Sequence, residues 1–462
     1  MDLWVISCIE NSRKNVCNMV FKIEFLGCKV NSYEVEAVAN ALKKAGFGEA
    51  KNGRRPDIVI INTCAVTHTS AVKSRKLIKK CRRLYPVAII VVMGCYSQYE
   101  YDYIADRLEA DIVIGTSNRD KIVDYIFDFI KNEKQIVKHD SPFDIKKYEN
   151  IQVTKYLDKT RAYVKIQDGC NNFCTYCLIP YVRGKSRSRN KEDILKEIHE
   201  LIKNGYKEII LTGIDIGSYG KDLSPTDTFS SLLKDILESE PTLYRLRVSS
   251  IEESQIDDLF LELLAKYKNI ASHLHIPLQS GSPLILKRMN RKYDLEGFKK
   301  AIVNLRKIRP DIAITTDVIV GFPGETQQEF WDTFNFVKDV GFSKVHVFPY
   351  SDREGTVASR IVDKVDEKDK KMRVLALLTL SNNLQKEYES YFYEEEIEFL
   401  FESYDEKAKA YRGHSSNYLE ILYKTDKNIK DEIIPVKFTK ENSALNFDIV
   451  KKTILNNDDN SI

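Results

Sequence analysis

The chain has 462 residues, enough for two or three domains with full-sized hydrophobic cores. Its 71 Lys and Arg residues nearly balance 68 Asp and Glu residues, so any contact with a nucleic acid would depend on local basic patches. Nine cysteines, an odd number spread along the chain, exclude a secreted disulfide framework, and no apolar run is long enough to span a membrane. We therefore expect a cytoplasmic protein in a compartment that keeps thiols reduced.

The first residues of the chain show no clear hydrophobic period. Met19 then opens directly onto a strand-like run. We interpret residues 1–18 as a leader that is not part of the working protein, as would follow from a start codon placed too early. Cys8 and Cys17 lie in this leader, so we expect neither to bind a metal.

Strand-like runs alternate with helical stretches over residues 19–130, at a spacing of roughly thirty residues, which is typical of βαβ units in a parallel sheet. Three of the runs end just before a cysteine, at Cys28, Cys64 and Cys95. Because the carboxyl ends of parallel strands form the ligand crevice, we expect these thiols to converge. A single such cysteine would be a small buried hydrophobe, and Cys81, on an apolar helix stripe, is expected to be one.

The predicted helix over residues 70–85 has a strongly basic face. A run of positive charge of this kind is usually a solvated surface, but no acidic residue balances it, so contact with phosphate is the sharper interpretation. Both alternatives stay open. The basic residues on this face are Lys73, Arg75, Lys76, Lys79, Lys80, Arg82 and Arg83.

Residues 131–155 are polar and predict an interdomain linker, followed by a second domain over residues 156–385. Six strand-like runs separated by amphipathic helices predict an open (β/α)6 partial barrel rather than a closed eight-stranded one. The runs begin near Ala162, Glu208, Tyr244, His273, Ile312 and Lys344.

The first strand of this barrel leads into a C-x3-C-x2-C motif formed by Cys170, Cys174 and Cys177. Three thiolates leave one iron of a [4Fe–4S] cluster without a protein ligand, so that iron can bind a small molecule. Zinc is the alternative, but it needs four ligands and no fourth Cys or His follows nearby. The motif is expected at the carboxyl-end mouth of the barrel, where barrel enzymes keep their sites.

Glycine-containing loops follow the other predicted barrel strands. They include residues 211–220, with Gly213, and residues 277–282, with Gln279. Ser249 lies at the end of the third strand, at the same rim. Glycine allows the backbone to approach a cofactor closely, although each loop alone could be an ordinary turn.

Five short alternating runs over residues 386–453 predict a small antiparallel β-barrel. A purely structural appendage is the alternative. Residues 454–462 are polar and are expected to form a disordered tail.

Taken together, these motifs resemble the radical S-adenosylmethionine (AdoMet) methylthiotransferases over about residues 20–453. The motifs are Gly-Cys-Lys-Val-Asn at 27–31, Asn-Thr-Cys at 62–64, Gly-Cys-Tyr at 94–96, the C-x3-C-x2-C loop, and Tyr-Arg-Gly-His-Ser-Ser-Asn-Tyr at 411–418. The resemblance implies an N-terminal methylthiotransferase domain, a radical AdoMet core and a C-terminal TRAM domain. It also implies two [4Fe–4S] clusters, one that binds AdoMet, held by Cys170, Cys174 and Cys177, and an auxiliary one held by Cys28, Cys64 and Cys95.

The resemblance further implies that one AdoMet methylates a sulfur on the auxiliary cluster. A second AdoMet would give a 5′-deoxyadenosyl radical that activates a C–H bond for delivery of the methylthio group. Tyr176 matches the aromatic residue that lies along the AdoMet adenine. Gly213, Ser249 and Gln279 are expected AdoMet contacts from their positions at the rim.

Branches of this family differ in substrate. Gly-Cys-Lys-Val-Asn and the stretch Asp168–Gly184 resemble the branch that places a methylthio group on C2 of N6-threonylcarbamoyladenosine at position 37 of tRNA. The isopentenyladenosine branch more often has Gly-Cys-Gln-Met-Asn, and the ribosomal-protein branch Gly-Cys-Pro-Lys-Asn. Methylthiolation of isopentenyladenosine-37 or of a ribosomal-protein aspartate is thus the alternative, and a non-catalytic iron–sulfur RNA-binding sensor is the alternative from another class.

The expected partners are tRNA, through its anticodon stem-loop, an electron donor and a sulfur source, but not DNA or a membrane. In this family the TRAM domain binds the tRNA. A basic loop beyond the cluster motif, from Arg183 through Lys185 to Arg189, would suit a phosphate path, with a solvated loop as the alternative. The candidate RNA contacts are Lys73, Lys76, Lys79, Lys80, Arg183, Arg187 and Arg412.

Overall fold

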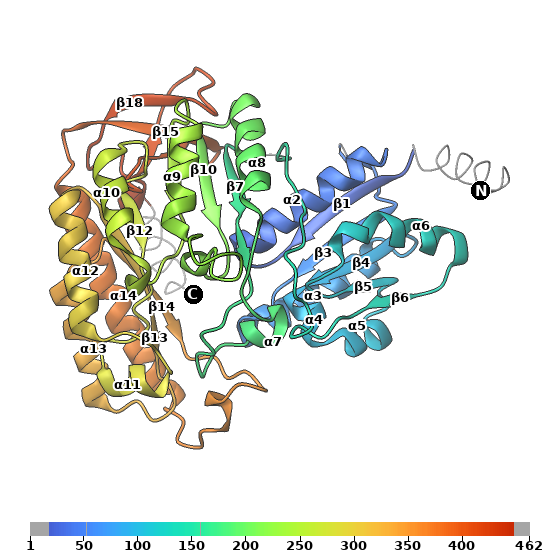
Figure 1. The fold of residues 1–462 in the computed structure, drawn as a ribbon, viewed down its shortest axis with the longest axis horizontal. Helices are drawn as coiled ribbons and strands as arrows, with labels where there is room; N and C mark the ends of the chain where they lie inside the picture. The colour runs from blue at the N-terminus through green and yellow to red at the C-terminus, as the bar shows by residue number, and fades with distance from the viewer. Residues whose placement is uncertain (1–17, 52, 158, 448–462) are drawn as a thin grey trace, which may run out of the picture.

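The computed structural model describes residues 18–51, 53–157 and 159–447. The predicted leader, apart from Asn18, and the predicted tail lie outside these residues. Figure 1 shows three units in chain order: a parallel sheet between helices, a curved α/β unit, and a smaller antiparallel sheet. The predicted α/β fold class is confirmed. In the part of the chain that is described, no helix is long and apolar enough to cross a membrane.

The first unit is a six-stranded parallel sheet of order β2-β1-β3-β4-β5-β6. Its strands are β1 (Val20–Phe25), β2 (Gly48–Glu49), β3 (Ile58–Thr63), β4 (Ile89–Gly94), β5 (Ile112–Ile114) and β6 (Ile136–Lys138). β6 falls in the segment predicted to be a linker. Its three residues pair with β5, so the sheet extends further along the chain than the polar composition indicates.

Both faces of this sheet are covered, because side chains along a strand point alternately to opposite faces. In β3, Ile58 and Ile60 belong to one hydrophobic core and Val59 and Ile61 to another. The first core packs under α2 (Lys29–Lys44) and α6 (Ile122–Asn132). The second core packs under α3 (His68–Leu84), α4 (Cys95–Tyr99) and α5 (Tyr101–Arg107). A 3-10 turn, η1 (Arg119–Lys121), precedes α6. Cys81 lies in the second core at 2% exposure, as predicted.

The second unit has six parallel strands that begin within one residue of the predicted positions. They are β7 (Arg161–Lys165), β10 (Glu208–Thr212), β11 (Arg245–Val248), β12 (His273–His275), β13 (Ala313–Val320) and β14 (Lys344–Pro349). They form two three-stranded sheets, β11-β10-β7 and β12-β13-β14, joined by bridges from Leu246 to Ile270 and from Ser250 to His275. Among the described residues β14 does not pair with β7, so the predicted open partial barrel is confirmed.

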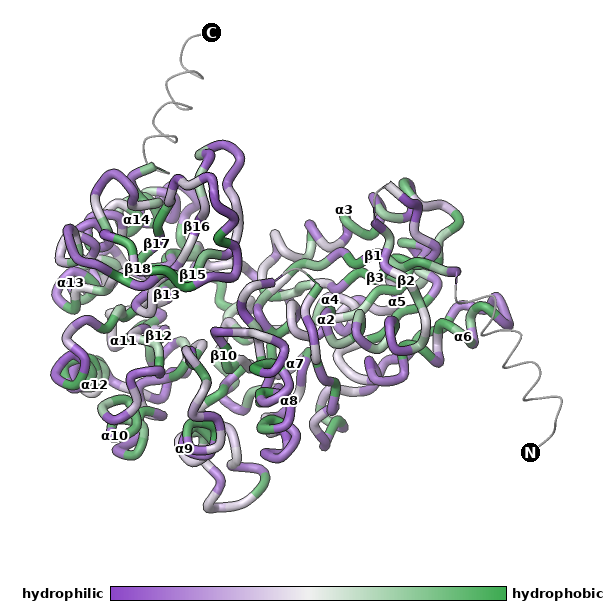
Figure 2. Tube along the Cα trace, turned by 90° about the horizontal axis from the view of Figure 1, so that it is seen from above, coloured by the Kyte–Doolittle hydropathy of each residue, from purple (hydrophilic) through white to green (hydrophobic). Residues whose placement is uncertain are grey.

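Helices cover the outside of this barrel (Figures 1 and 2). Their first turns are capped by side chains: Asn190 accepts hydrogen bonds from the backbone of α8, and Thr326 with Glu329 forms a capping box on α13. The helices are α8 (Lys191–Lys203), α9 (Phe229–Ser239), α10 (Asp258–Lys266), α12 (Leu295–Ile308), α13 (Gln327–Val340) and α14 (Glu367–Ser390). Smaller elements at the strand ends are β8 (Gln167–Asp168), α7 (Ile179–Arg183), β9 (Arg187–Ser188), η2 (Ile216–Ser218), η3 (Glu253–Gln255), α11 (Pro283–Arg288) and η4 (Ala358–Arg360).

The third unit is an antiparallel sheet of order β17-β16-β15-β18. Its strands are β15 (Glu396–Asp405), β16 (Ala410–His414), β17 (Glu420–Tyr423) and β18 (Ile433–Lys437). Four of the five predicted strands are present, but within residues 396–437 they form an open sheet, not a closed barrel. The fifth predicted run covers residues 446–450; its first two residues are helical, and the other three lie outside the described residues.

The three units share buried contacts. Tyr33 and Ala37 of α2 belong to the hydrophobic core of the barrel, while Leu178 and Val182, in and beside α7, belong to the core of the first unit. From β11 of the barrel, Arg247 donates hydrogen bonds to the carbonyl oxygens of the loop after β16. Both neighbours are therefore held against the barrel.

Candidate active site

The loop after β8 carries the C-x3-C-x2-C motif into a cavity at the carboxyl end of the barrel. Cys170, Cys174 and Cys177 all line this cavity, whose volume is about 210 Å³. Gly169 shapes the loop: its φ is +74°, and a Cβ there would collide with the backbone of Lys185. The backbone N–H of Cys170 donates to the carbonyl oxygen of Gly184, so the loop is tied to the far end of α7. The remaining lining residues are Asn172, Tyr176, Ile179, Ile214, Asp215, Ser250, Glu252, Gln255, Pro277, Gln279 and Arg291.

A polar network surrounds these thiols. Arg291 donates from Nη1 to the Cys174 sulfur at 3.3 Å and pairs through Nη2 with Glu252 at 2.8 Å. Its Nε is buried without a hydrogen-bond partner. Asp215 accepts a hydrogen bond from Gln255 at 2.6 Å and lies 3.9 Å from the Cys170 sulfur. A guanidinium beside the thiols suits them as anionic thiolates, the form that binds iron.

The predicted AdoMet contacts divide into two groups. Tyr176 and Gln279 line the cysteine cavity. Gly213 and Ser249 do not, although the residue after each of them does. A Cβ on Gly213 would lie 2.9 Å from the carbonyl oxygen of Gln167, so glycine allows the loop after β10 to pack against β8. Contact with AdoMet stays a prediction for all four.

The second cysteine set lies at the carboxyl edge of the first sheet, where Cys28, Cys64 and Cys95 follow β1, β3 and β4. Cys28 is exposed and the other two are buried. Asn31 fastens the loops together, because its Nδ2 donates to the carbonyl oxygens of Leu26, at 2.9 Å, and of Thr63, at 3.1 Å.

Electrostatics link this set to the barrel. Burial raises the pKa of the Cys95 thiol to about 12, the Arg183 guanidinium lowers it, and the thiols of Cys64 and Cys28 raise it further. Arg183 donates from Nε to the Cys95 sulfur at 3.3 Å. Each cysteine set thus has one arginine against a thiol, Arg291 for the first and Arg183 for the second.

The first cysteine set fits a [4Fe–4S] cluster, because its three thiols line one cavity. Among the described residues no three Cys, His, Asp or Glu side chains are arranged to hold one metal ion. A [4Fe–4S] cluster is larger and takes thiolates from more widely separated positions. Cys170, Cys174 and Cys177 around one cavity, with Arg291 to balance the thiolate charge, match that requirement.

The structure corrects the predicted basic loop. Arg183, Arg187 and Arg189 are 0%, 4% and 0% exposed. Arg183 pairs with Glu34 at 2.8 Å and with Asp168 at 3.0 Å. These arginines neutralise buried carboxylates between the first two units, so the expectation of RNA contact fails for Arg183 and Arg187. Lys185 alone in this loop is exposed.

The other candidate RNA contacts lie at the surface. Lys73, Lys76, Lys79 and Lys80 are exposed along one side of α3. Arg82 on the same helix instead pairs with Asp111 at 2.6 Å. Arg412 is partly buried and pairs with Asp405 at 3.4 Å and with Glu420 at 3.2 Å. The four lysines of α3 therefore keep the basic surface that the sequence predicts.

The chain matches two protein-family models and is similar to known tRNA-modifying enzymes. Residues 164–337 match the model of the Radical SAM superfamily, and residues 20–115 match that of Uncharacterized protein family UPF0004. The threonylcarbamoyladenosine tRNA methylthiotransferase of Bacillus subtilis is 43% identical over 418 residues, covering 90% of this chain and 92% of its own. That of Thermotoga maritima is 39% identical over 384 residues, covering 83% and 86%.

Two more distant relatives add context. The tRNA-2-methylthio-N(6)-dimethylallyladenosine synthase of Pelotomaculum thermopropionicum is 34% identical over 432 residues, covering 91% of this chain and 95% of its own. Among solved structures, the radical S-adenosylmethionine methyltransferase TsrM from Kitasatospora setae has a TM-score of 0.54 at 13% identity, with 74% of each chain covered. The second likeness concerns the fold alone.

Proposed function

Because the chain belongs to the radical AdoMet methylthiotransferase family, in the branch of the threonylcarbamoyladenosine tRNA enzymes, we propose that it transfers a methylthio group to C2 of N6-threonylcarbamoyladenosine at position 37 of tRNA. The two relatives with that name are 43% and 39% identical to the chain, against 34% for the dimethylallyladenosine enzyme. The substrate assignment rests on this order and on the Gly-Cys-Lys-Val-Asn motif.

One observation carries the proposal: α7 joins the two cysteine sets. This helix begins at Ile179, two residues after Cys177, and ends at Arg183, whose Nε contacts the Cys95 sulfur. Five helical residues rise only about 7 Å, so chemistry at the first set and sulfur at the second can meet on one substrate. A sensor that only binds RNA would have no need of this proximity.

Membership in the radical SAM superfamily implies AdoMet and one [4Fe–4S] cluster, and the donor sets support a second cluster as part of this proposal. Cys170, Cys174 and Cys177 would hold the AdoMet cluster, and the three cysteines of the first sheet would hold the auxiliary one. The first would supply the radical that activates a C–H bond, and the second would supply the sulfur. Arg291, held by Glu252, would balance thiolate charge at the first set, while Tyr176 and Gln279 would bound the AdoMet site.

The remaining parts of the proposal concern partners and domain roles. The anticodon stem-loop would lie along the exposed lysines of α3, where phosphates find unbalanced positive charge. An electron donor and a sulfur source in the cytoplasm would complete the reaction. We assign residues 19–138, a range that includes β6, to the methylthiotransferase domain, 156–385 to the radical AdoMet core, and 386–453 to the TRAM domain.

Anaerobic reconstitution tests the proposal. Protein loaded with iron and sulfide is incubated with AdoMet, a reductant and anticodon stem-loops that carry adenosine, dimethylallyladenosine or threonylcarbamoyladenosine at the target position. Nucleoside mass spectrometry should detect a methylthio product only with the last RNA. A methylthio product only on dimethylallyladenosine would contradict the substrate, and absence of both 5′-deoxyadenosine and methylthio product would favour the sensor.

A further inference from the structure

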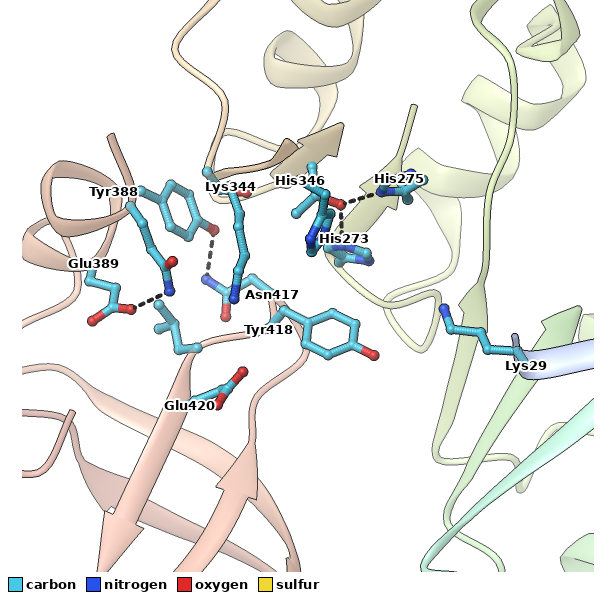
Figure 3. Close-up of a pocket in the computed structure, with 14 residues that line it drawn as sticks. Lys29, His273, His275, Lys344, His346, Tyr388, Glu389, Asn417, Tyr418 and Glu420 are labelled. Atoms are coloured by element: carbon cyan, nitrogen blue, oxygen red, sulfur yellow. Dashed lines mark hydrogen bonds between the residues drawn. The ribbon is translucent and has the colours of Figure 1, made fainter. Parts of the chain in front are cut away.

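A second cavity, of about 290 Å³, lies where all three units meet. It shares no residue with the cysteine cavity. Figure 3 shows a group of barrel histidines, with Tyr418 of the third unit below them and Lys29 of α2 to the right. The lining of the cavity includes Lys29, His273, Thr315, Lys344, Tyr418 and Glu420.

The cations of this cavity are unpaired. Neither the Lys29 nor the Lys344 ammonium forms a hydrogen bond or an ion pair in the described part of the chain. The carboxylates that line the cavity are already engaged: Glu420 with His414 and Arg412, and Glu389 with Ser443. An anion entering the cavity would therefore meet two lysines with no competing partner.

A buried histidine adds an unused polar atom. His273 is 6% exposed, and its Nε2 shares a hydrogen bond of 3.0 Å with the Thr315 hydroxyl. Its Nδ1 is buried without a partner. A buried polar atom left unpaired costs free energy, so the site is incomplete until a ligand supplies a partner.

We propose that this cavity receives the threonylcarbamoyl group of the target nucleoside, an inference that rests on the proposed function. Lys29 and Lys344 bind the carboxylate of the group, and His273 binds its hydroxyl. The group ends in a carboxylate and a hydroxyl, which match two ammonium groups and an unpaired imidazole nitrogen. A dimethylallyl group is a hydrocarbon and would leave both ammonium groups and the imidazole nitrogen unpaired. The same residues thus select one substrate of the family and reject the other.

The position of the cavity agrees with the chemistry of adenine. C2 and C6 both flank N1 of the ring, so a pocket for the substituent on N6 must lie near the group that delivers sulfur to C2. Lys29 directly follows Cys28, which caps the amino end of α2. One lining residue is therefore covalently adjacent to the second cysteine set.

The test removes charge from each partner in turn. Dissociation constants are measured for the iron-loaded protein with a stem-loop that carries threonylcarbamoyladenosine and with one whose carboxylate is converted to a methyl amide. The wild-type protein should bind the carboxylate about 10-fold or more tightly, the range for a charged hydrogen bond. Lys29→Met and Lys344→Met should each reduce that preference several-fold, whereas Lys299→Met, at an exposed position on α12, should leave it unchanged.

Iron content is measured for each variant. If Lys29→Met loses iron, the result for Lys344→Met is decisive, because Lys344 lies in β14, away from both cysteine sets. An unchanged preference in both iron-containing variants would overturn the inference, even if the wild-type protein methylthiolates threonylcarbamoyladenosine. A wild-type protein that acts only on dimethylallyladenosine would instead overturn the proposed function, and the inference with it.

Discussion

Replacement of Glu34 by Gln should strongly destabilise the contact between the first unit and the barrel. Glu34 lies on α2 with 0% of its surface exposed. Its carboxylate pairs with Lys165 at 2.8 Å, with Arg183 at 2.8 Å, and with Arg119. Burial opposes its ionisation, but these three cations hold the pKa of Glu34 well below the usual range.

The magnitude follows from the charges that remain. Gln keeps the volume of the side chain but removes the negative charge, and three buried cations then share Asp168 and the partly exposed Glu149. Breaking a buried ion pair by neutralising one partner costs about 3–5 kcal/mol. We expect the free energy of unfolding to fall by that amount.

Urea denaturation of the cluster-free protein, followed by circular dichroism under reducing conditions, measures the change. Glu238→Gln is the matched control, because Glu238 forms one ion pair with Lys234 and both side chains are about half exposed, at 48% and 49%. A pair of this kind contributes less than about 1 kcal/mol. Equal shifts of the denaturation midpoint for the two variants would refute the importance of the buried network.

Three further predictions concern the cysteines, the basic helix and the third unit. Alanine at Cys170, Cys174 or Cys177 should abolish formation of both 5′-deoxyadenosine and the methylthio product. Alanine at Cys28, Cys64 or Cys95 should abolish only the methylthio product. Cys81→Ala should lower the free energy of unfolding by about 2 kcal/mol and leave both activities unchanged. A Cys64→Ala protein with full methylthiolation would overturn the cluster assignment. Reversal of Lys76, Lys79 and Lys80 to Glu should weaken tRNA binding and flatten its salt dependence, by roughly 0.7–0.9 in log–log slope for each lost phosphate contact; unchanged affinity would make α3 a solvated face. Although burial opposes it, hydrogen bonds with Glu402 and Glu420 raise the pKa of His414 to about 9. Its stabilising effect should be complete below the unfolded pKa of about 6.5 and lost as pH rises through about 9, by roughly 3 kcal/mol at most. Denaturation at pH 6 and pH 9 should show this loss of stability in the wild-type protein and not in His414→Gln. The same loss in both proteins would exclude His414 as its cause.

The strands of the first two units could be predicted because each carries a local signal. Their apolar runs have the length of buried strands, and a cysteine or a glycine loop marks where β1, β3, β4 and β10 end. The carboxyl edge follows from parallel connectivity alone. The position of both cysteine sets was therefore accessible without any long-range contact.

The role of the arginines after the cysteine loop could not be predicted. Arg183 and Arg189 look like surface charges in the sequence, because their carboxylate partners, Glu34 and Glu197, lie on other elements. Glu34 meets Arg183 only because α2 packs against the barrel, whereas Glu197 meets Arg189 because α8 packs against the loop that precedes it. Likewise, closure of a small barrel depends on pairing between its first and last strands, which short alternating runs do not specify.

Nucleoside mass spectrometry of tRNA from cells with and without this gene is the most direct test of the proposed substrate. Without the gene, the methylthio derivative of threonylcarbamoyladenosine should be lost and threonylcarbamoyladenosine should accumulate in its place. The wild-type gene should restore the derivative, and a Cys64→Ala gene should not. Persistence of that derivative with loss of methylthio-dimethylallyladenosine would show that the protein acts on the other substrate.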